Sequence, residues 1–330
     1  MKKVLIFLVA ISYVFFLTGC GKSEEDVIKK LSKKINGSDT YHITGVFELK
    51  NNEESYLYNI NVDYKKEDNF KVSLVNQTNN HEQIILKNAD GVYVLTPSLN
   101  KSFKFQSEWP YNNSQTYILQ SLLKDIEDDS EKDVQKTENG YTITTSVNYS
   151  NKKDLVKQNI YLDKDSNITK VEVLDISNQP KIIMNFDKID FNATIDDNYF
   201  KLENSVYKDE TKDVPVSSID GIVFPMYVPT DTYLTSQDII ETETGQRAIL
   251  TFNGESPFTI IQETISNKDN FYGELNDGEP QLILDTVGVV SDSFVSWMSN
   301  GIEYHVISDE LSQEELLSVA NSISVMPISK

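Results

Sequence analysis

The sequence is poor in the residues that build disulfides, metal sites and strongly cationic surfaces. It holds one cysteine, Cys20, so no disulfide can form within the chain. Three histidines, His42, His81 and His305, are scattered, and no two stand at the spacing of zinc ligands. Arginine occurs once, at Arg247, and the formal net charge is −21. Such a charge argues against nucleic acid as a partner, because affinity for nucleic acid comes first from neutralising phosphates.

Motifs of catalysis or cofactor binding are also missing. The glycines of 88–91 and 276–278 stand in turn sequences rather than in a phosphate-binding loop. The acidic clusters 125–133 and 309–315 lack the alternating oxygen ligands and central glycine of a calcium loop. We therefore expect no catalytic residue, no metal, no cofactor and no enzymatic activity.

The N-terminus reads as an export signal. Lys2 and Lys3 precede an apolar run from Val4 to Leu17, which is typical of a signal peptide over residues 1–19. Leu17-Thr-Gly-Cys20 resembles a bacterial lipobox, and the resemblance implies that Cys20 carries acyl chains such as palmitate. Two or more chains anchor a protein durably to a membrane. The expected location is the extracytoplasmic face of the cell membrane; a plain signal or anchor helix with a chance cysteine is the alternative.

A first helix is expected directly behind the anchor. Ser23 is a suitable cap, apolar residues recur at Val27, Leu31 and Ile35, and Asn36-Gly37 ends the run. The spacer 20–22 is so short that this helix should lie against the membrane. Its basic residues are then expected to face lipid head groups, although a solvated lysine face is an equal alternative: Lys22, Lys29, Lys30, Lys33 and Lys34.

From Tyr41 onward the apolar residues alternate, which predicts strands. A helical stripe over 115–125 interrupts them. Short turns between the segments favour antiparallel pairing, with two helices on one face of the sheet. This gives an α+β domain over 23–203 with about eleven strands, at 41–49, 56–64, 69–76, 81–87, 92–96, 101–105, 131–137, 141–149, 156–163, 168–175 and 180–189.

A polar linker over 204–214 should lead to a smaller α+β domain over 215–330, which has 18 acidic residues and three basic ones. Two prolines, Pro225 and Pro229, leave 222–228 an edge strand at best. A helix should follow Leu311, with Ser312 and Glu315 as a capping box. Strands are expected at 247–253, 258–265, 281–289, 293–298 and 302–308.

The first domain resembles the LolA/LolB-like superfamily, which includes RseB. The resemblance lies in Val92 to Pro97 with Lys101, Trp109-Pro110, Asn113 to Gln115 and the helix around 119–123. It is nearest to the YdcC-like sporulation and GerS-related germination lipoproteins of Gram-positive bacteria. It implies a curved antiparallel sheet, an incomplete β-barrel, whose concave side encloses an apolar cleft under covering helices. Carriers of this superfamily have an important arginine near the cleft, whereas Arg247 lies outside the LolA-like region.

Seven apolar and aromatic residues are expected to line that cleft, unless they are simply the buried face of the sheet: Phe47, Tyr56, Tyr58, Ile60, Trp109, Leu119 and Leu122. The leading functional hypothesis is a lipoprotein that binds and regulates an exported partner, such as a cell-wall enzyme, in sporulation, germination or envelope assembly. The alternative is binding, sensing or transfer of lipid or lipoprotein acyl chains in the cleft. A third hypothesis is that the protein is a purely structural tether.

Overall fold

The computed structural model describes residues 24–51, 54–99, 101–105, 107–149, 152–205, 219, 221–242, 245–264, 272–275, 278–299 and 301–323. The expected signal peptide, Cys20, Lys22 and residues 206–214 of the expected linker lie outside this part. Within it, no helix has the length and apolar character needed to cross a membrane.

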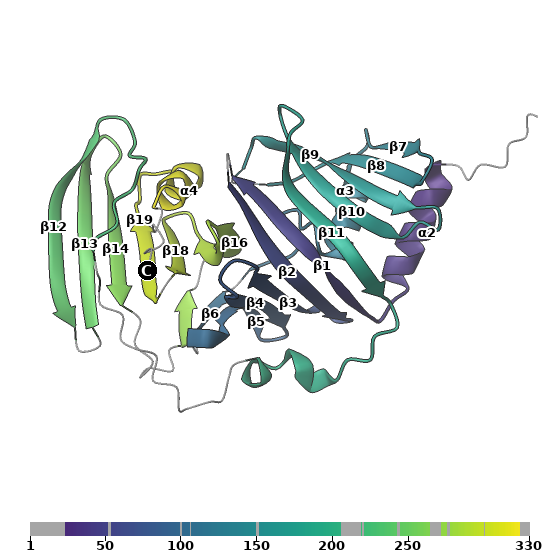
Figure 1. Ribbon diagram of the computed structural model, residues 1–330, viewed down its shortest axis with the longest axis horizontal. Coiled ribbons are helices and arrows are strands. Elements are labelled where there is room, and N and C mark those ends of the chain that lie inside the picture. Colours follow the sequence, from purple (N-terminus) through teal and green to yellow (C-terminus); the bar gives the residue numbers. More distant parts are fainter. Residues whose placement is uncertain are drawn as a thin grey trace, which may run out of the picture.

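The first domain is a curved, open sheet (Figure 1). Its eleven antiparallel strands confirm the predicted number and fold class, and their order is β6-β5-β4-β3-β2-β1-β11-β10-β9-β8-β7. Strands β6 and β7 stand at opposite ends and are not paired, so the barrel stays incomplete. The strands are β1 (Thr40–Asn51), β2 (Glu54–Lys65), β3 (Asn69–Asn76), β4 (Glu82–Asn88), β5 (Gly91–Thr96), β6 (Lys101–Phe105), β7 (Asp133–Lys136), β8 (Gly140–Ser146), β9 (Leu155–Asp163), β10 (Ile168–Asp175) and β11 (Pro180–Asp190). A short 3-10 helix, η1 (Pro97–Leu99), joins β5 to β6.

The order of the strands explains why one face is covered. The chain starts in the middle of the sheet, moves outward from β1 to β6, crosses to the far edge and returns from β7 to β11, which pairs with β1. The crossing segment carries helix α3 (Leu119–Asp128), and α2 (Glu24–Asn36) packs beside it. Both helices place their apolar stripes in the same core as the inner sides of the strands. The two predicted helices are thereby confirmed.

Helix α3 begins at Leu119, four residues later than its apolar stripe indicates. The reason is a polar tie just before it: the Ser114 N–H donates to the Asn148 carbonyl, and the Asn148 N–H donates to the Ser114 hydroxyl, each at 2.8 Å. These bonds fix Ser114 beside the residues that follow β8, and a turn closed by the Ile118 N–H donating to the Gln115 carbonyl at 3.3 Å comes before the helix.

Burial alternates along β1, but its pairing with β11 shifts register between Thr44 and Gly45. A Cβ atom at Gly45 would lie 2.2 Å from the Asn185 carbonyl oxygen. The close approach of the two central strands therefore requires glycine at this position.

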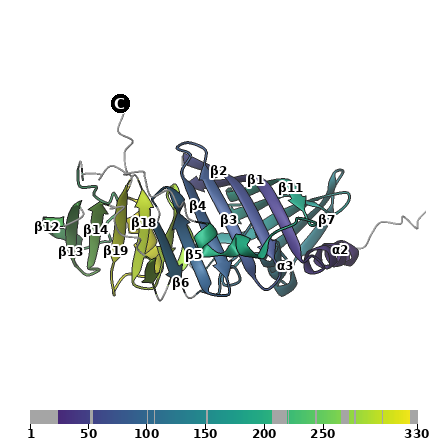
Figure 2. The same cartoon turned by 90° about the horizontal axis from the view of Figure 1, so that it is seen from below.

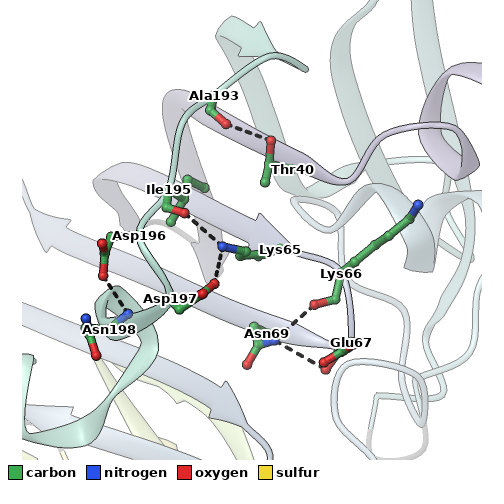
Figure 3. Close-up of polar contacts among 10 residues, drawn as sticks. All are labelled: Thr40, Lys65, Lys66, Glu67, Asn69, Ala193, Ile195, Asp196, Asp197 and Asn198. Atoms are coloured by element: carbon green, nitrogen blue, oxygen red, sulfur yellow. Dashed lines mark hydrogen bonds and ion pairs between the residues drawn. The ribbon is translucent and has the colours of Figure 1, made fainter.

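A strap of residues 191–205 leaves β11 and lies on the other face of the sheet (Figure 3). Thr40 donates to the Ala193 carbonyl at 2.7 Å, and the Lys65 ammonium donates to the Ile195 carbonyl at 3.0 Å and pairs with Asp197. Its 3-10 turns η2 (Asp197–Phe200) and η3 (Leu202–Asn204) cover a small apolar cluster formed by Ile84, Leu86, Tyr93, Leu95 and Phe200.

The second domain is a seven-stranded antiparallel sheet in the order β12-β13-β14-β19-β18-β17-β16, with α4 (Gln313–Asn321) packed on it. The capping box of Ser312 and Glu315 is present. The strands are β12 (Thr232–Thr242), β13 (Gly245–Gly254), β14 (Phe258–Thr264), β16 (Glu279–Ile283), β17 (Thr286–Val290), β18 (Phe294–Ser299) and β19 (Ile302–Ile307); β15 (Tyr272–Leu275) pairs with the first sheet.

Three details of this domain differ from the sequence-based expectation. The stretch 281–289 is a hairpin rather than one strand, because Leu284 takes a φ of +53° and turns the chain between β16 and β17. Residues 222–228 form no strand: Val223 bonds to the side chain of Gln262, so the segment lies across the face of the sheet. Strands β12 and β15 were not expected.

Candidate functional site

The two domains are joined at the β6 edge of the first sheet (Figure 2). Strand β15 pairs in parallel with β6, Tyr272 opposite Ser102 and Leu275 opposite Phe105. In the sequence this strand lies between β14 and β16 of the second sheet, so backbone pairing ties the chain of the second sheet to the edge of the first.

The β16–β17 hairpin packs against the core of the first sheet. Val287 and Val289 are 3% and 1% exposed and are part of the first domain's hydrophobic core, with Leu282 packed against it. Three apolar side chains from a distant part of the chain thus complete this core.

Gln83 of β4 fixes the hairpin in this position. Its side-chain amide donates to the Val287 carbonyl at 2.8 Å, and its side-chain oxygen accepts from the Val287 N–H. Gln83 is 3% exposed, so both bonds are shielded from water. A buried backbone group left without a partner is costly, so this pair specifies where the hairpin docks.

Polar contacts at the rim add to this attachment. Asn76 and Asn79 donate to the carbonyl and carboxylate of Asp285, in the hairpin turn, at 3.4 and 3.3 Å. At the start of the hairpin, Asn113 donates a hydrogen bond to Glu279 at 2.5 Å. Burial raises the pKa of Glu279. The amide hydrogen bond acts in the opposite direction, because it favours the ionised carboxylate.

A cavity of about 80 Å³ remains between the hairpin and the first sheet. Sites for small molecules usually enclose roughly 300–1,000 Å³, so this one is filled mostly by protein. Lys152 borders it, and burial lowers the pKa of this lysine. The apolar walls include Phe47, Leu49, Leu74, Ile85, Tyr117, Ile182 and Leu282.

A second cavity, of about 270 Å³, opens between the domains beside the first. Three lysines, Lys50, Lys152 and Lys181, line it together with two acidic residues, Asp154 and Glu314. Its charges are therefore nearly balanced.

The seven residues expected to line a cleft lie in or next to this core. Phe47 borders the apolar cavity and Tyr56 the polar one. The other five, Tyr58, Ile60, Trp109, Leu119 and Leu122, are at most 2% exposed and pack in the first domain's core. Their sequence pattern does not indicate that the β16–β17 hairpin, which begins at Glu279, packs in the same core.

The lysines of α2 differ in their surroundings. Lys29, Lys30 and Lys33 are exposed, and Lys29 pairs with Glu25 at 2.7 Å. Lys34 is half-buried, bonds to the side-chain oxygen of Asn167 and lies 4.8 Å from the centre of the Phe191 ring. Three of the described lysines on this helix are therefore accessible to a surface.

Two carboxyl groups stand out by their hydrogen bonds. Asp63 bonds to His42 at 2.7 Å and accepts from Tyr199 at 2.8 Å, which ties the strap to the sheet. Asp125 of α3 accepts from Gln158 at 2.7 Å, and burial raises its pKa to about 6. Across the described residues no three acidic, histidine or cysteine side chains are grouped as metal ligands.

No family model matches the chain. It is 33% identical over 335 residues to the sporulation protein YdcC of Bacillus subtilis (strain 168), a match that covers 98% of this chain and 97% of YdcC.

Solved structures give weaker likenesses. The complex of Pseudomonas aeruginosa MucA and MucB matches at 13% identity and a TM-score of 0.33, over 90% of this chain and 96% of the other. The GerS lipoprotein in complex with the CwlD amidase, from Clostridioides difficile, matches at 21% and 0.32, over 51% and 95%. A LolA superfamily protein of Nitrosomonas europaea matches at 11% and 0.31, over 54% and 97%.

Proposed function

The chain belongs to the family of the Bacillus subtilis sporulation protein YdcC, and from this premise we propose that it is a lipid-anchored protein on the outer face of the cell membrane that binds and regulates an exported partner. The partner is a protein of sporulation, germination or envelope assembly, such as a cell-wall enzyme. Cys20 carries the lipid, and the exposed lysines of α2 lie toward the head groups.

One observation favours a partner-binding protein over a carrier: the β16–β17 hairpin fills the cleft. A carrier needs a cavity that its cargo can enter, whereas here about 80 Å³ remains open beside Val287 and Leu282. The two joined sheets present broad outer surfaces, and broad surfaces are the kind of site that binds another protein.

Affinity purification of the membrane-anchored chain from sporulating cells tests the proposal. We expect one exported protein to be recovered in near-equal amount, and its activity or abundance to change when the gene for this chain is deleted. A Cys20→Ala variant is the matched control for the anchor: it should leave the membrane fraction while keeping its affinity for the purified partner. Recovery of no exported protein from wild-type cells would contradict the proposal.

Binding of an acyl chain is the second candidate, favoured by the apolar walls of the small cavity and by Lys152 at its border. A chain could enter only if the hairpin moved out. Native mass spectrometry distinguishes the two: a lipid that co-purifies with the wild-type protein and is lost from Leu74→Trp, which fills the cavity, supports lipid binding. A wild-type protein that purifies without lipid contradicts it.

A further inference from the structure

The far edge of the second sheet carries a surface that the docked hairpin does not use. Strand β12 ends the sheet order, and in the described part of the chain it pairs on one side only, with β13. Its side chains are exposed on both faces: Tyr233, Ile239 and Ile240 are 63%, 58% and 47% exposed. An unpaired edge with apolar side chains is a template for a strand from another chain.

Much of this edge lacks two of the features that usually protect such strands, lysine and proline. A bulge at Thr235 shifts the register with β13, and such bulges disturb pairing locally. From Ser236 to Glu241 the register is continuous, and this stretch holds neither proline nor lysine. A typical strand has about five or six residues, so the segment is long enough to accept a partner.

The charge around the edge selects the kind of partner. From residue 221 to 246 there is no lysine or arginine, whereas Asp231, Asp238 and Glu241 lie on the strand or next to it. Arg247, which follows, binds Glu263 through two hydrogen bonds of 2.9 Å. A second copy of this chain would place acidic strands side by side, and like charges across a strand pair are unfavourable. A cationic strand complements the edge.

The position of the edge suits an exported partner. Helix α2, which follows Cys20 in the sequence, lies at one end of the long axis, and β12 lies at the other end (Figures 1 and 2). With α2 against the membrane, β12 is the described strand farthest from the lipid surface and open to the surrounding medium.

We propose that an extended, lysine- or arginine-bearing segment of another exported protein pairs with β12 and becomes the eighth strand of the second sheet. This inference rests on the proposed function and identifies the surface and the chemistry of the partner. Backbone hydrogen bonds hold the added strand, and its basic residues pair with Asp238 and Glu241.

The test uses the full chain in detergent and two synthetic ten-residue peptides of alternating threonine and valine, one with lysine at three positions and one with glutamate there. Amide hydrogen exchange should slow over 232–242 when the lysine peptide is added, and the glutamate peptide should have no effect. Raising the salt concentration should weaken the interaction, because exposed charges are screened. No protection with either peptide would overturn the proposal.

Ser236→Lys combined with Ile240→Lys should weaken binding of the lysine peptide at least tenfold, because both residues lie on the exposed edge. The matched control places lysine at Leu57 and Val156, each 38% exposed on inner strands of the first sheet, and should bind as wild type. Equal binding by the edge variant and the control would overturn the proposal. So would concentration-dependent dimers that the edge variant abolishes, since the occupant would then be a second copy.

The same variant separates this inference from the proposed function. If the edge variant retains its exported partner in sporulating cells as well as wild type does, the β12 surface is wrong and the partner-binding function stands. If wild type recovers no exported protein, the proposed function itself is wrong, whatever the peptides do.

Discussion

Replacing Gln83 with alanine should loosen the second domain from the first. The change removes both hydrogen bonds to Val287 and leaves a buried N–H and a buried carbonyl without their partners. Each unsatisfied buried group costs about 1–3 kcal/mol, and water entering the vacated space offsets part of this. We therefore expect the variant to lose about 2–4 kcal/mol of the free energy that holds the hairpin in place.

Two tryptophans make the effect measurable in each domain separately. Trp109 lies in the core of the first domain and Trp297 in that of the second, at 1% and 2% exposure. In Trp109→Phe protein the remaining fluorescence follows the second sheet, and in Trp297→Phe protein it follows the first. With a urea dependence of about 1–3 kcal/mol per molar, Gln83→Ala should lower the midpoint reported by Trp297 by about 1–2 M.

The matched control is Gln135→Ala, because Gln135 is an exposed glutamine on the edge strand β7 of the same sheet. Its midpoints should stay close to wild type. A Gln83→Ala protein whose Trp297 midpoint equals that of the control would refute the idea that this side chain fixes the hairpin.

Three further outcomes follow from single residues. Burial raises the pKa of the Asp125 carboxyl group from 3.8 to about 6, so the folded state binds the carboxyl proton more tightly than the unfolded state does. The free energy of unfolding should therefore fall as the pH rises from about 4 to about 6. Asp125→Asn should flatten this part of the stability curve and raise the free energy of unfolding above pH 6 by about 2 kcal/mol, as urea titrations at several pH values can check. Gly45→Ala should lower that free energy by about 1–3 kcal/mol, because its Cβ would meet the Asn185 carbonyl oxygen; an unchanged melting temperature would contradict the close approach. Cys20→Ala should move the protein from the membrane to the soluble fraction, and continued membrane association would exclude the lipid as the anchor.

Much of the first sheet could be predicted from the sequence because many of its strands are more deeply buried on one side. Residues of β3 such as Phe70, Val72 and Leu74 are buried and alternate with half-buried ones, as their apolar character in the sequence indicates. Helix α4 was equally clear, since Ser312 and Glu315 form a capping box that is local in sequence. Periodicity and capping are properties of neighbouring residues, so they need no knowledge of the fold.

The junction could not be predicted in the same way. Gln83 looks like an ordinary polar residue within a strand, and its partner Val287 lies 204 positions later. Strand β12 was missed because both of its faces are exposed, which removes the alternation on which strand prediction depends. The hairpin turn rests on Leu284 at positive φ, where glycine or asparagine would have signalled it.

Amide hydrogen exchange at Val287 tests most directly whether the second domain occupies the cleft. In the hairpin its N–H donates to the side chain of Gln83, so its protection depends on docking against the first sheet. We expect this amide in the wild-type protein to exchange at least about a hundredfold more slowly than an exposed one, and Gln83→Ala to remove most of that protection. An amide at Val287 that exchanges in the wild-type protein as fast as an exposed loop amide would contradict the filled cleft.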